Sequence, residues 1–157
     1  MKSKLSITEF RNTLNENTKI GSQIFKMNLG IFSVFFPKSK YFYGKFDQST
    51  FQLTINYNFN SAYYILKGNY KNNFDNKLKV NYSIEPMSKI RIIGLKYFPL
   101  IVFFGLNIFF YFKKMPTEVF IPFNLLIIFA ILHSRWHLKK DLKNLESKFI
   151  EIFKIIE

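Results

Sequence analysis

The sequence predicts an α+β membrane protein with a short N-terminal helix, an antiparallel β-meander of about five strands, a two-helix transmembrane hairpin and an amphipathic C-terminal helix. Three observations lead to this prediction. Two long apolar runs between residues 97 and 134 flank a short charged turn. Apolar and polar residues alternate in much of the chain before residue 84, and apolar residues recur at helical spacing near both ends. We therefore divide the chain into a domain of helix plus β-meander (1–89), a hairpin (90–136) and a C-terminal helix (137–157).

A short amphipathic helix is expected over residues 6–18. Ser6 is followed three residues later by Glu9, which is the pattern of a capping box. Ile7, Phe10 and Leu14 recur at helical spacing and form one narrow apolar stripe. Such a stripe needs a surface to pack on, and we expect the following sheet to provide it.

The segment that follows carries the two-residue period of β-strands. Residues 51–57 and 77–84 alternate without a fault, so each predicts a strand with one buried face. Further strand candidates lie at residues 23–36, 40–46 and 62–70. The short polar separators between these segments favour hairpins and hence an antiparallel meander, which Pro86 ends. Gly44 and Gly68 each stand alone within a strand, which indicates a bulge or close packing rather than a phosphate loop.

The two apolar runs predict a membrane hairpin with spans of about 90–112 and 118–136. Residues 97–112 alone would give about 24 Å of helix, and extension back to Ile90 gives about 34 Å, against a hydrocarbon core of about 30 Å. Two buried helices of a soluble protein are the alternative, which we disfavour because the rest of the chain supplies too little helix to cover them. Asn107 and Asn124 are expected to hydrogen-bond across the hairpin or between copies.

Basic and aromatic side chains flank both spans, where they suit the membrane interface. The residues expected there are Arg91, Lys96, Lys113, Lys114, Arg135, Trp136, Lys139 and Lys140. Cations are more numerous before and after the hairpin than in its turn, where Glu118 opposes Lys113 and Lys114. The positive-inside rule therefore predicts that both termini are cytoplasmic, in a bacterial inner membrane.

The C-terminal segment has the pattern of an amphipathic helix that continues from the second span. Its apolar positions are Leu138, Leu142, Leu145, Phe149, Ile152 and Ile156. This stripe has three possible partners: the sheet, the membrane surface, or another copy of the chain. We favour the sheet, because a lone meander needs a cover for its apolar face.

The amino-acid composition limits the classes of binding partner that we expect. The net charge is +13, but only three of the 23 basic residues are Arg, and Lys, Asn, Ile and Phe are all frequent, as in an AT-rich coding sequence. Nucleic-acid surfaces use Arg for bidentate contacts, so we expect no nucleic-acid partner. The excess Lys has two interpretations: it suits anionic lipid headgroups, or it reflects the coding composition and has no role. The absence of Cys excludes a disulfide scaffold, thiol catalysis and cysteine zinc sites.

Residues with catalytic or metal-binding potential are few. His133, His137 and Asp141 share one helical face, but the Glu that completes a zinc-protease motif is missing between the histidines. These three residues are the metal candidates. The simpler interpretation is that the two histidines are polar residues of the membrane interface and that Asp141 is an acidic partner for Lys. The carboxylates are scattered and suggest no acid–base pair. We expect no catalytic residues and no cofactor.

The middle of the chain resembles a family of small bacterial two-span membrane proteins with an N-terminal β-rich domain. The resemblance is carried by Tyr43-Gly44-Lys45-Phe46, Phe51-Gln52-Leu53, Asn60-Ser61, Gly68-Asn69-Tyr70 and the strand that ends at Pro86. The chain departs from the family pattern at Asn56 and Tyr64, where the family has Arg and Pro. The resemblance implies the order helix, sheet, hairpin and basic C-terminal helix, and it implies no activity.

These observations together predict a non-enzymatic integral membrane protein that presents a cytoplasmic β-module for binding or assembly. Its expected partners are the lipid bilayer and either another copy of itself or another membrane protein. Two alternatives stay open. One is binding of anionic lipid headgroups in the manner of a pleckstrin-homology domain, and the other is an oligomeric pore.

Overall fold

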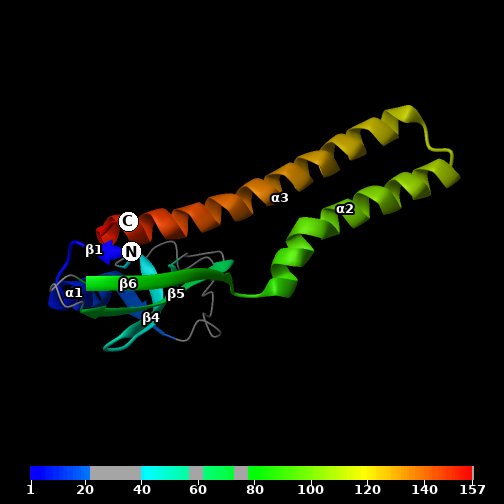
Figure 1. Cartoon of the computed structure of the whole chain (residues 1–157). Coiled ribbons are helices and arrows are strands. Elements are labelled where there is room, and N and C mark those ends of the chain that lie inside the picture. The colour runs from blue at the N-terminus through cyan, green and yellow to red at the C-terminus, as the bar shows by residue number, and fades with distance from the viewer. Residues whose placement is uncertain (22–39, 57–61, 73–77, 157) are drawn as a thin grey trace. The chain divides into compact units, whose positions relative to one another are not determined.

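A computed structural model of the chain describes residues 1–21, 40–56, 62–72 and 78–156 (Figure 1). The chain divides into two compact units, one formed by Met1–Met87 with Asp141–Glu157 and the other by Ser88–Lys140. The first unit, called here the sheet domain, is α+β and is built on one mixed sheet. The second, called here the helical hairpin, contains two long apolar helices. The strand expected within residues 23–36 lies outside the described residues.

Helix α1 (Ile7–Asn17) begins where the capping box predicted it. The Ser6 hydroxyl accepts a hydrogen bond from the Glu9 backbone N–H at 3.3 Å, and Glu9 Oε2 accepts one from the Ser6 backbone N–H at 2.7 Å. The Ser6 N–H, followed by its hydroxyl, holds the pKa of Glu9 below its usual value. At the other end Lys40 Nζ donates to the Asn15 carbonyl at 2.6 Å, which places a cation where the helix dipole favours one.

The sheet has seven strands in the described residues, in the order β2-β3-β4-β5-β6-β1-β7. They are β1 (Lys2–Ser3), β2 (Thr18–Ile20), β3 (Phe42–Phe46), β4 (Thr50–Ile55), β5 (Tyr64–Asn72), β6 (Leu78–Pro86) and β7 (Ile155–Ile156). Strands β3 to β6 pair antiparallel with one another, as the short polar separators between them predicted. The last of them ends at Pro86, also as predicted.

The sheet as a whole is mixed, so the prediction of an antiparallel meander of about five strands is confirmed only in part. Strand β2 pairs with β3 in parallel, and β1 and β7 extend the sheet beyond β6. The sequence could not predict these three strands because two or three residues are too few to show a period of two. Their partners are also distant in the chain, since β1 and β7 bring its two ends together.

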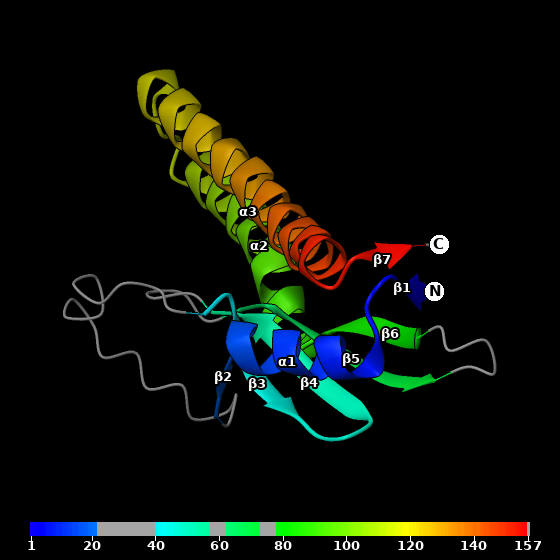
Figure 2. The same cartoon turned by 90° about the vertical axis from the view of Figure 1, so that its left-hand side faces the viewer.

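The core of the sheet domain lies between one face of the sheet, called here the inner face, and the two helices packed on it. Helix α1 crosses the sheet in Figure 2 and places the Phe10 ring centroid 4.8 Å from Tyr70 and 4.7 Å from Phe153. The C-terminal part of helix α3 (Thr117–Ile152) places Phe149 5.3 Å from Phe51. These rings are buried, so the C-terminal segment packs on the sheet in this structure.

Gly68 is needed for close packing in β5. A Cβ built on Gly68 would collide with the Phe51 ring and lie 2.5 Å from the backbone oxygen of Asn81. The ring of Phe51 therefore occupies space that any other residue at position 68 would fill. Of the two interpretations of this glycine, close packing is the correct one.

The chain after helix α3 differs from the expected helix, which was to continue to Ile156. The helix ends at Ile152, and Lys154 adopts a φ of 48°, a left-handed conformation that commonly ends helices. The Ser3 hydroxyl donates to the Phe153 carbonyl at 2.7 Å, and the Lys4 N–H donates to the Lys154 carbonyl at 3.1 Å. Because β1 offers hydrogen-bond partners here, the last apolar residues form a strand instead of a further helical turn.

The turn between β3 and β4 is held by Asp47. Its carboxylate accepts hydrogen bonds from the Thr50 hydroxyl at 2.7 Å and from the backbone N–H groups of Ser49 and Thr50 at 2.8 and 2.6 Å. The Thr50 hydroxyl, followed by these N–H groups, lowers the pKa of Asp47 to about 2. The Tyr70 hydroxyl donates to the Asp47 carbonyl at 2.7 Å, and Arg11 donates to the turn backbone at 2.7 Å. The turn is thereby tied to β5 and α1.

Candidate functional site

The helical hairpin is the first candidate for a functional region. It consists of α2 (Lys89–Phe112) and the part of α3 that precedes Asp141. Both helices are long and apolar enough to cross a membrane, and no residue in the most apolar 18-residue window of either is buried. The exposed large side chains include Phe104, Ile108, Leu125, Leu126 and Phe129. Such a large exposed apolar surface marks a site of contact with lipid or another protein.

Two asparagines connect the helices of the hairpin. Asn107 Nδ2 donates to Asn124 Oδ1 at 2.7 Å, and Asn124 Nδ2 donates to Asn107 Oδ1 at 3.0 Å. Asn107 Nδ2 also donates to the Phe103 carbonyl at 2.7 Å. Of the two predicted arrangements, pairing across the hairpin is the one present.

A tight turn joins the two helices. Lys114 has a φ of 49°, and the Met115 N–H donates to the Phe110 carbonyl at 3.1 Å, which satisfies one of the last carbonyls of α2. Phe110 is buried, with ring centroids 6.1 Å from Phe120 and 5.8 Å from Phe123. Aromatic packing therefore closes the turn end of the hairpin.

The residues predicted to lie at a membrane interface all belong to the helical hairpin. Arg91 and Lys96 lie near the start of α2, Lys113 and Lys114 lie in the turn, and the rest lie on α3: Arg135, Trp136, Lys139 and Lys140. Lys140 Nζ lies 4.7 Å from the Trp136 ring centroid, and Lys96 Nζ lies 5.4 Å from that of Tyr97. Both are within the range of cation–π contacts.

The metal candidates do not form a metal centre in this structure. The His133 and His137 rings are 6.1 Å apart, but Asp141 is buried in the sheet domain, where its Oδ2 accepts a hydrogen bond from the Tyr63 N–H at 3.1 Å. Throughout the described residues, no three His, Asp or Glu side chains are placed to hold a metal ion together. The acidic residue therefore has a structural partner that its spacing from the histidines did not reveal.

A second candidate is the outer face of the sheet, which is the face opposite the core. Within the described strands it carries one carboxylate, Glu85, and a larger set of lysines: Lys2, Lys19, Lys45, Lys67, Lys71 and Lys79. Glu85 pairs with Lys67 at 2.8 Å. The face therefore has a strong excess of positive charge, which favours anions.

Strand register sorts the polar side chains of the outer face into rows across neighbouring strands. Directly opposite residues share a row, and three successive rows are Gln52–Lys67–Ser83, Thr50–Asn69–Asn81 and Lys71–Lys79–Lys2. We call the third the lysine row. Each row lies two residues from the next along its strands, so the rows form one continuous polar surface.

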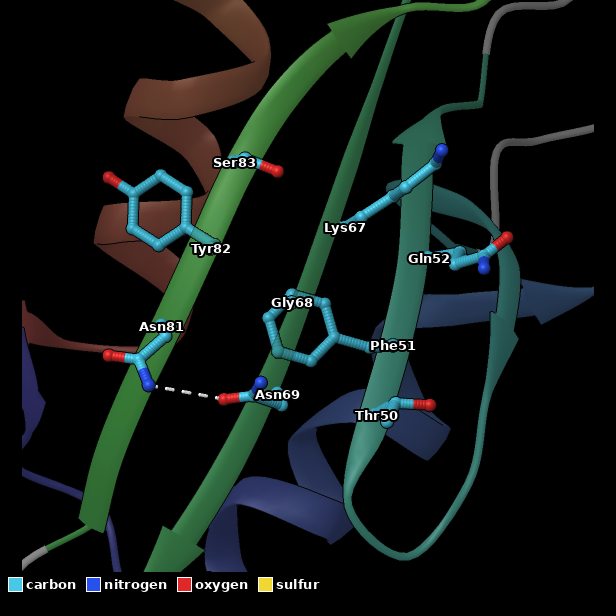
Figure 3. A pocket seen from close by; sticks show the side chains of 9 residues that line it. All are labelled: Thr50, Phe51, Gln52, Lys67, Gly68, Asn69, Asn81, Tyr82 and Ser83. Carbon is cyan, nitrogen blue, oxygen red and sulfur yellow. Dashed lines mark hydrogen bonds between the residues drawn. The ribbon is translucent and has the colours of Figure 1, made fainter.

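The first two rows line an open depression of about 530 Å³. Figure 3 shows their side chains around it, with a hydrogen bond of 3.2 Å from Asn81 Nδ2 to Asn69 Oδ1. The backbone between the rows, at Gly68 and its neighbours, also lines the depression. Lys67 is the cationic side chain among the residues that line the depression, and it forms an ion pair with Glu85.

Sequence reasoning missed this surface. The alternation that predicts strands also identifies Lys67, Asn69, Lys71, Lys79 and Asn81 as outward-facing, and that signal was present. What it does not specify is which outward residues stand opposite one another. The register of β5 and β6, and the addition of β1 beside β6, bring the lysines into one row.

The fold and these surfaces define an α+β domain joined to two helices that are long and apolar enough to cross a membrane. No family model, curated protein sequence or solved structure matches the chain. The resemblance to the two-span membrane family therefore rests only on the residues that suggested it.

Proposed function

We propose that the protein is a non-enzymatic integral membrane protein that holds its sheet domain at the bilayer for binding or assembly. Two observations carry this proposal: the helical hairpin has an exposed apolar surface, and the sheet domain has a hydrophobic core of its own. Lipid covers such a surface favourably, at about −0.3 to −0.6 kcal/mol for each central Leu, Ile, Phe or Val.

The asparagine pair supports this placement. A polar amide in hydrocarbon is costly unless it is hydrogen-bonded. Asn107 and Asn124 satisfy each other within one hairpin, so the apolar surface carries no strongly polar residue that would need water or a second chain. The hairpin is therefore suited to lipid as a single copy.

The proposed location is a bacterial inner membrane with both termini in the cytoplasm. Lys89, Arg91 and Lys96 precede the apolar part of the hairpin, and Arg135 follows it within a basic segment. The turn has fewer cations and carries Glu118. This asymmetry supports the orientation under the positive-inside rule.

Five carboxylates of the sheet domain have structural partners, which supports a binding role rather than a chemical one. Among the described residues, Glu9 and Asp47 hold a helix cap and a turn. Glu85 pairs with Lys67, Asp141 accepts from a backbone N–H, and Glu146 accepts a hydrogen bond from a tyrosine hydroxyl. Each of these groups therefore has a structural partner.

Membrane fractionation with proteolysis tests the proposal. Inside-out vesicles prepared from cells that express the full chain are washed with alkaline carbonate and then treated with trypsin. We expect the chain to stay in the pellet and trypsin to remove the sheet domain while the apolar part of the hairpin is protected. A chain that is released by carbonate contradicts the proposal.

A second candidate function is binding of anionic lipid headgroups, which the basic residues Lys89, Arg91, Lys96, Lys139 and Lys140 favour. Hydrogen exchange on the full chain, compared between vesicles of phosphatidylcholine and vesicles that also contain phosphatidylglycerol, tests it. Added protection over residues 89–96 and 135–140 in anionic vesicles supports headgroup binding, and identical exchange removes it. The third candidate, an oligomeric pore, predicts dye leakage from reconstituted vesicles, and tight vesicles remove it.

A further inference from the structure

We propose that the outer face of the sheet binds the phosphate group of a phosphorylated small molecule. Its phosphate is held by the lysine row (Lys2, Lys79 and Lys71), and its polar body lies in the adjoining depression. This proposal specifies a class of ligand for the binding function proposed above, and it rests on that function. The proposal is carried by strand register, charge and the shape of the surface.

The lysine row brings three cations together. Lys79 stands directly opposite Lys2 on one side and Lys71 on the other. Neighbouring strands lie about 4.8 Å apart and directly opposite Cβ atoms about 5 Å apart, so three flexible ammonium groups can converge on one phosphate. All three side chains are exposed. The two ion pairs found among the described residues, Lys67–Glu85 and Lys148–Glu151, do not involve them.

Folding alone does not account for this row. Like charges directly opposite one another destabilise a sheet, and Lys79 has a like charge on both sides. A bound polyanion converts this repulsion into attraction and makes charge-assisted hydrogen bonds with each ammonium group. The arrangement is therefore the one that an anion-binding surface requires.

The depression supplies neutral hydrogen-bonding groups next to the lysine row. Asn69 and Asn81 lie one row away, about 7 Å along their strands. Because Asn81 Nδ2 donates to Asn69 Oδ1, Asn69 Nδ2 remains oriented as a donor and Asn81 Oδ1 as an acceptor (Figure 3). The Ser83 hydroxyl adds a group in the next row. A volume of about 530 Å³ is in the range of small-molecule sites.

A phosphate group at this position has two possible sources, a soluble ligand and a lipid headgroup. Strand β6 leads into α2 through its last residue, Pro86, whereas Lys79 lies near its first residue, Leu78. Lys79 precedes Pro86 by seven positions in the strand, a length of about 23 Å. The lysine row and the connection to α2 therefore lie at opposite ends of β6, and the two nanodisc compositions described below distinguish the two sources of the phosphate.

Calorimetric titration of the full chain tests the site, with pyrophosphate as the probe. The protein is held in nanodiscs of phosphatidylcholine, so that no anionic lipid competes. We expect saturable binding, which the double variant Lys71→Gln/Lys79→Gln weakens at least tenfold. Asn69→Asp, which places a carboxylate beside the row, should weaken binding to a similar extent. Thermal unfolding of each variant checks that the sheet domain remains folded.

Lys19→Gln is the matched control, because Lys19 is exposed on the same face but belongs to the far edge strand β2. It should change pyrophosphate affinity less than twofold. Absence of saturable binding, or an equal loss in Lys19→Gln, overturns the proposal. Nanodiscs that contain phosphatidylglycerol form a second arm: unchanged affinity supports a soluble ligand, and a tenfold loss by competition shows a headgroup site instead. Co-elution of the protein with the discs tests the anchor independently, so failure of the anchor and failure of this site give different results.

Discussion

Asn107 and Asn124 exchange two amide hydrogen bonds, of 2.7 and 3.0 Å, across the helical hairpin. One residue comes from each helix, and both side chains are partly buried between them. Each amide therefore obtains both a donor and an acceptor from its partner. The pair fixes the register of the two helices and leaves their outward surfaces apolar.

Replacing one asparagine with leucine should destabilise the hairpin, because the remaining amide loses its partner. We expect Asn107→Leu or Asn124→Leu to cost about 0.6 kcal/mol, the average for side-chain hydrogen bonds between helices in membranes, and at most about 1.7 kcal/mol. The double variant should recover part of this loss, since two leucines leave no amide unpaired. Reversible unfolding in micelles measures the coupling. A double variant whose loss of stability equals the sum of the two single losses would contradict the pairing.

Phe149 should contribute strongly to the stability of the sheet domain. Its side chain is fully buried between Phe51 and Phe153, so Phe149→Ala should cost about 3–5 kcal/mol. The neighbouring Ile150 is exposed and serves as the control, with an expected change within about 0.5 kcal/mol for Ile150→Ala. Thermal unfolding followed by near-ultraviolet circular dichroism compares the two. Equal effects would mean that the C-terminal helix lies on another surface.

Gly68 should tolerate no side chain. The added methyl of Gly68→Ala meets the Phe51 ring and the Asn81 backbone oxygen, so we expect a loss of about 1–3 kcal/mol from overpacking. Gly94→Ala is the matched control, because a Cβ on Gly94 meets nothing within 4 Å and alanine favours a helix. Melting temperatures of the two variants test this difference. A Gly68→Ala protein as stable as the parent would contradict the close packing in β5.

Acid should weaken the turn between β3 and β4. The pKa of Asp47 falls from 3.8 to about 2 in the folded protein, so the stability that its carboxylate contributes is present above pH 3.8 and lost as the pH falls toward 2. Asp47→Asn should therefore flatten the decline in melting temperature between pH 4 and pH 2, while Glu16→Gln controls for the change in charge. The Asp47 carboxyl resonance should also titrate near pH 2. An unchanged decline in Asp47→Asn would contradict this role.

Local signals predicted the elements whose partners are near in sequence. The Ser6–Glu9 capping box predicted the start of α1. Alternation predicted β4 and β6, because successive side chains of a strand lie on opposite faces of the sheet, and β3 and β5 fall on the further strand candidates 40–46 and 62–70. The strands β1, β2 and β7 were missed, since they are too short to show a period. The end of α3 was also missed, because the hydrogen bonds that favour β7 come from Ser3 and Lys4, at the other end of the chain.

The candidate sites were predictable to different degrees. Asn107 and Asn124 are strongly polar residues within apolar runs, so the sequence predicted that they form hydrogen bonds either across the hairpin or between copies. The lysine row was not predictable, because Lys2 lies opposite Lys79 only through the pairing of β1 with β6, and these two strands are distant in sequence. His133, His137 and Asp141 have helical spacing, but spacing cannot reveal that a backbone N–H already binds the carboxylate.

Single-cysteine labelling tests the central claim, that the helical hairpin crosses the membrane with both flanks on the same side. The chain has no cysteine, so Met115→Cys in the turn and Ser147→Cys on α3 each give one thiol without background. With a membrane-impermeant maleimide on intact spheroplasts, we expect Met115→Cys to be labelled and Ser147→Cys to be labelled only after lysis. Equal labelling of both positions before lysis, or labelling of Ser147→Cys alone, would contradict the account.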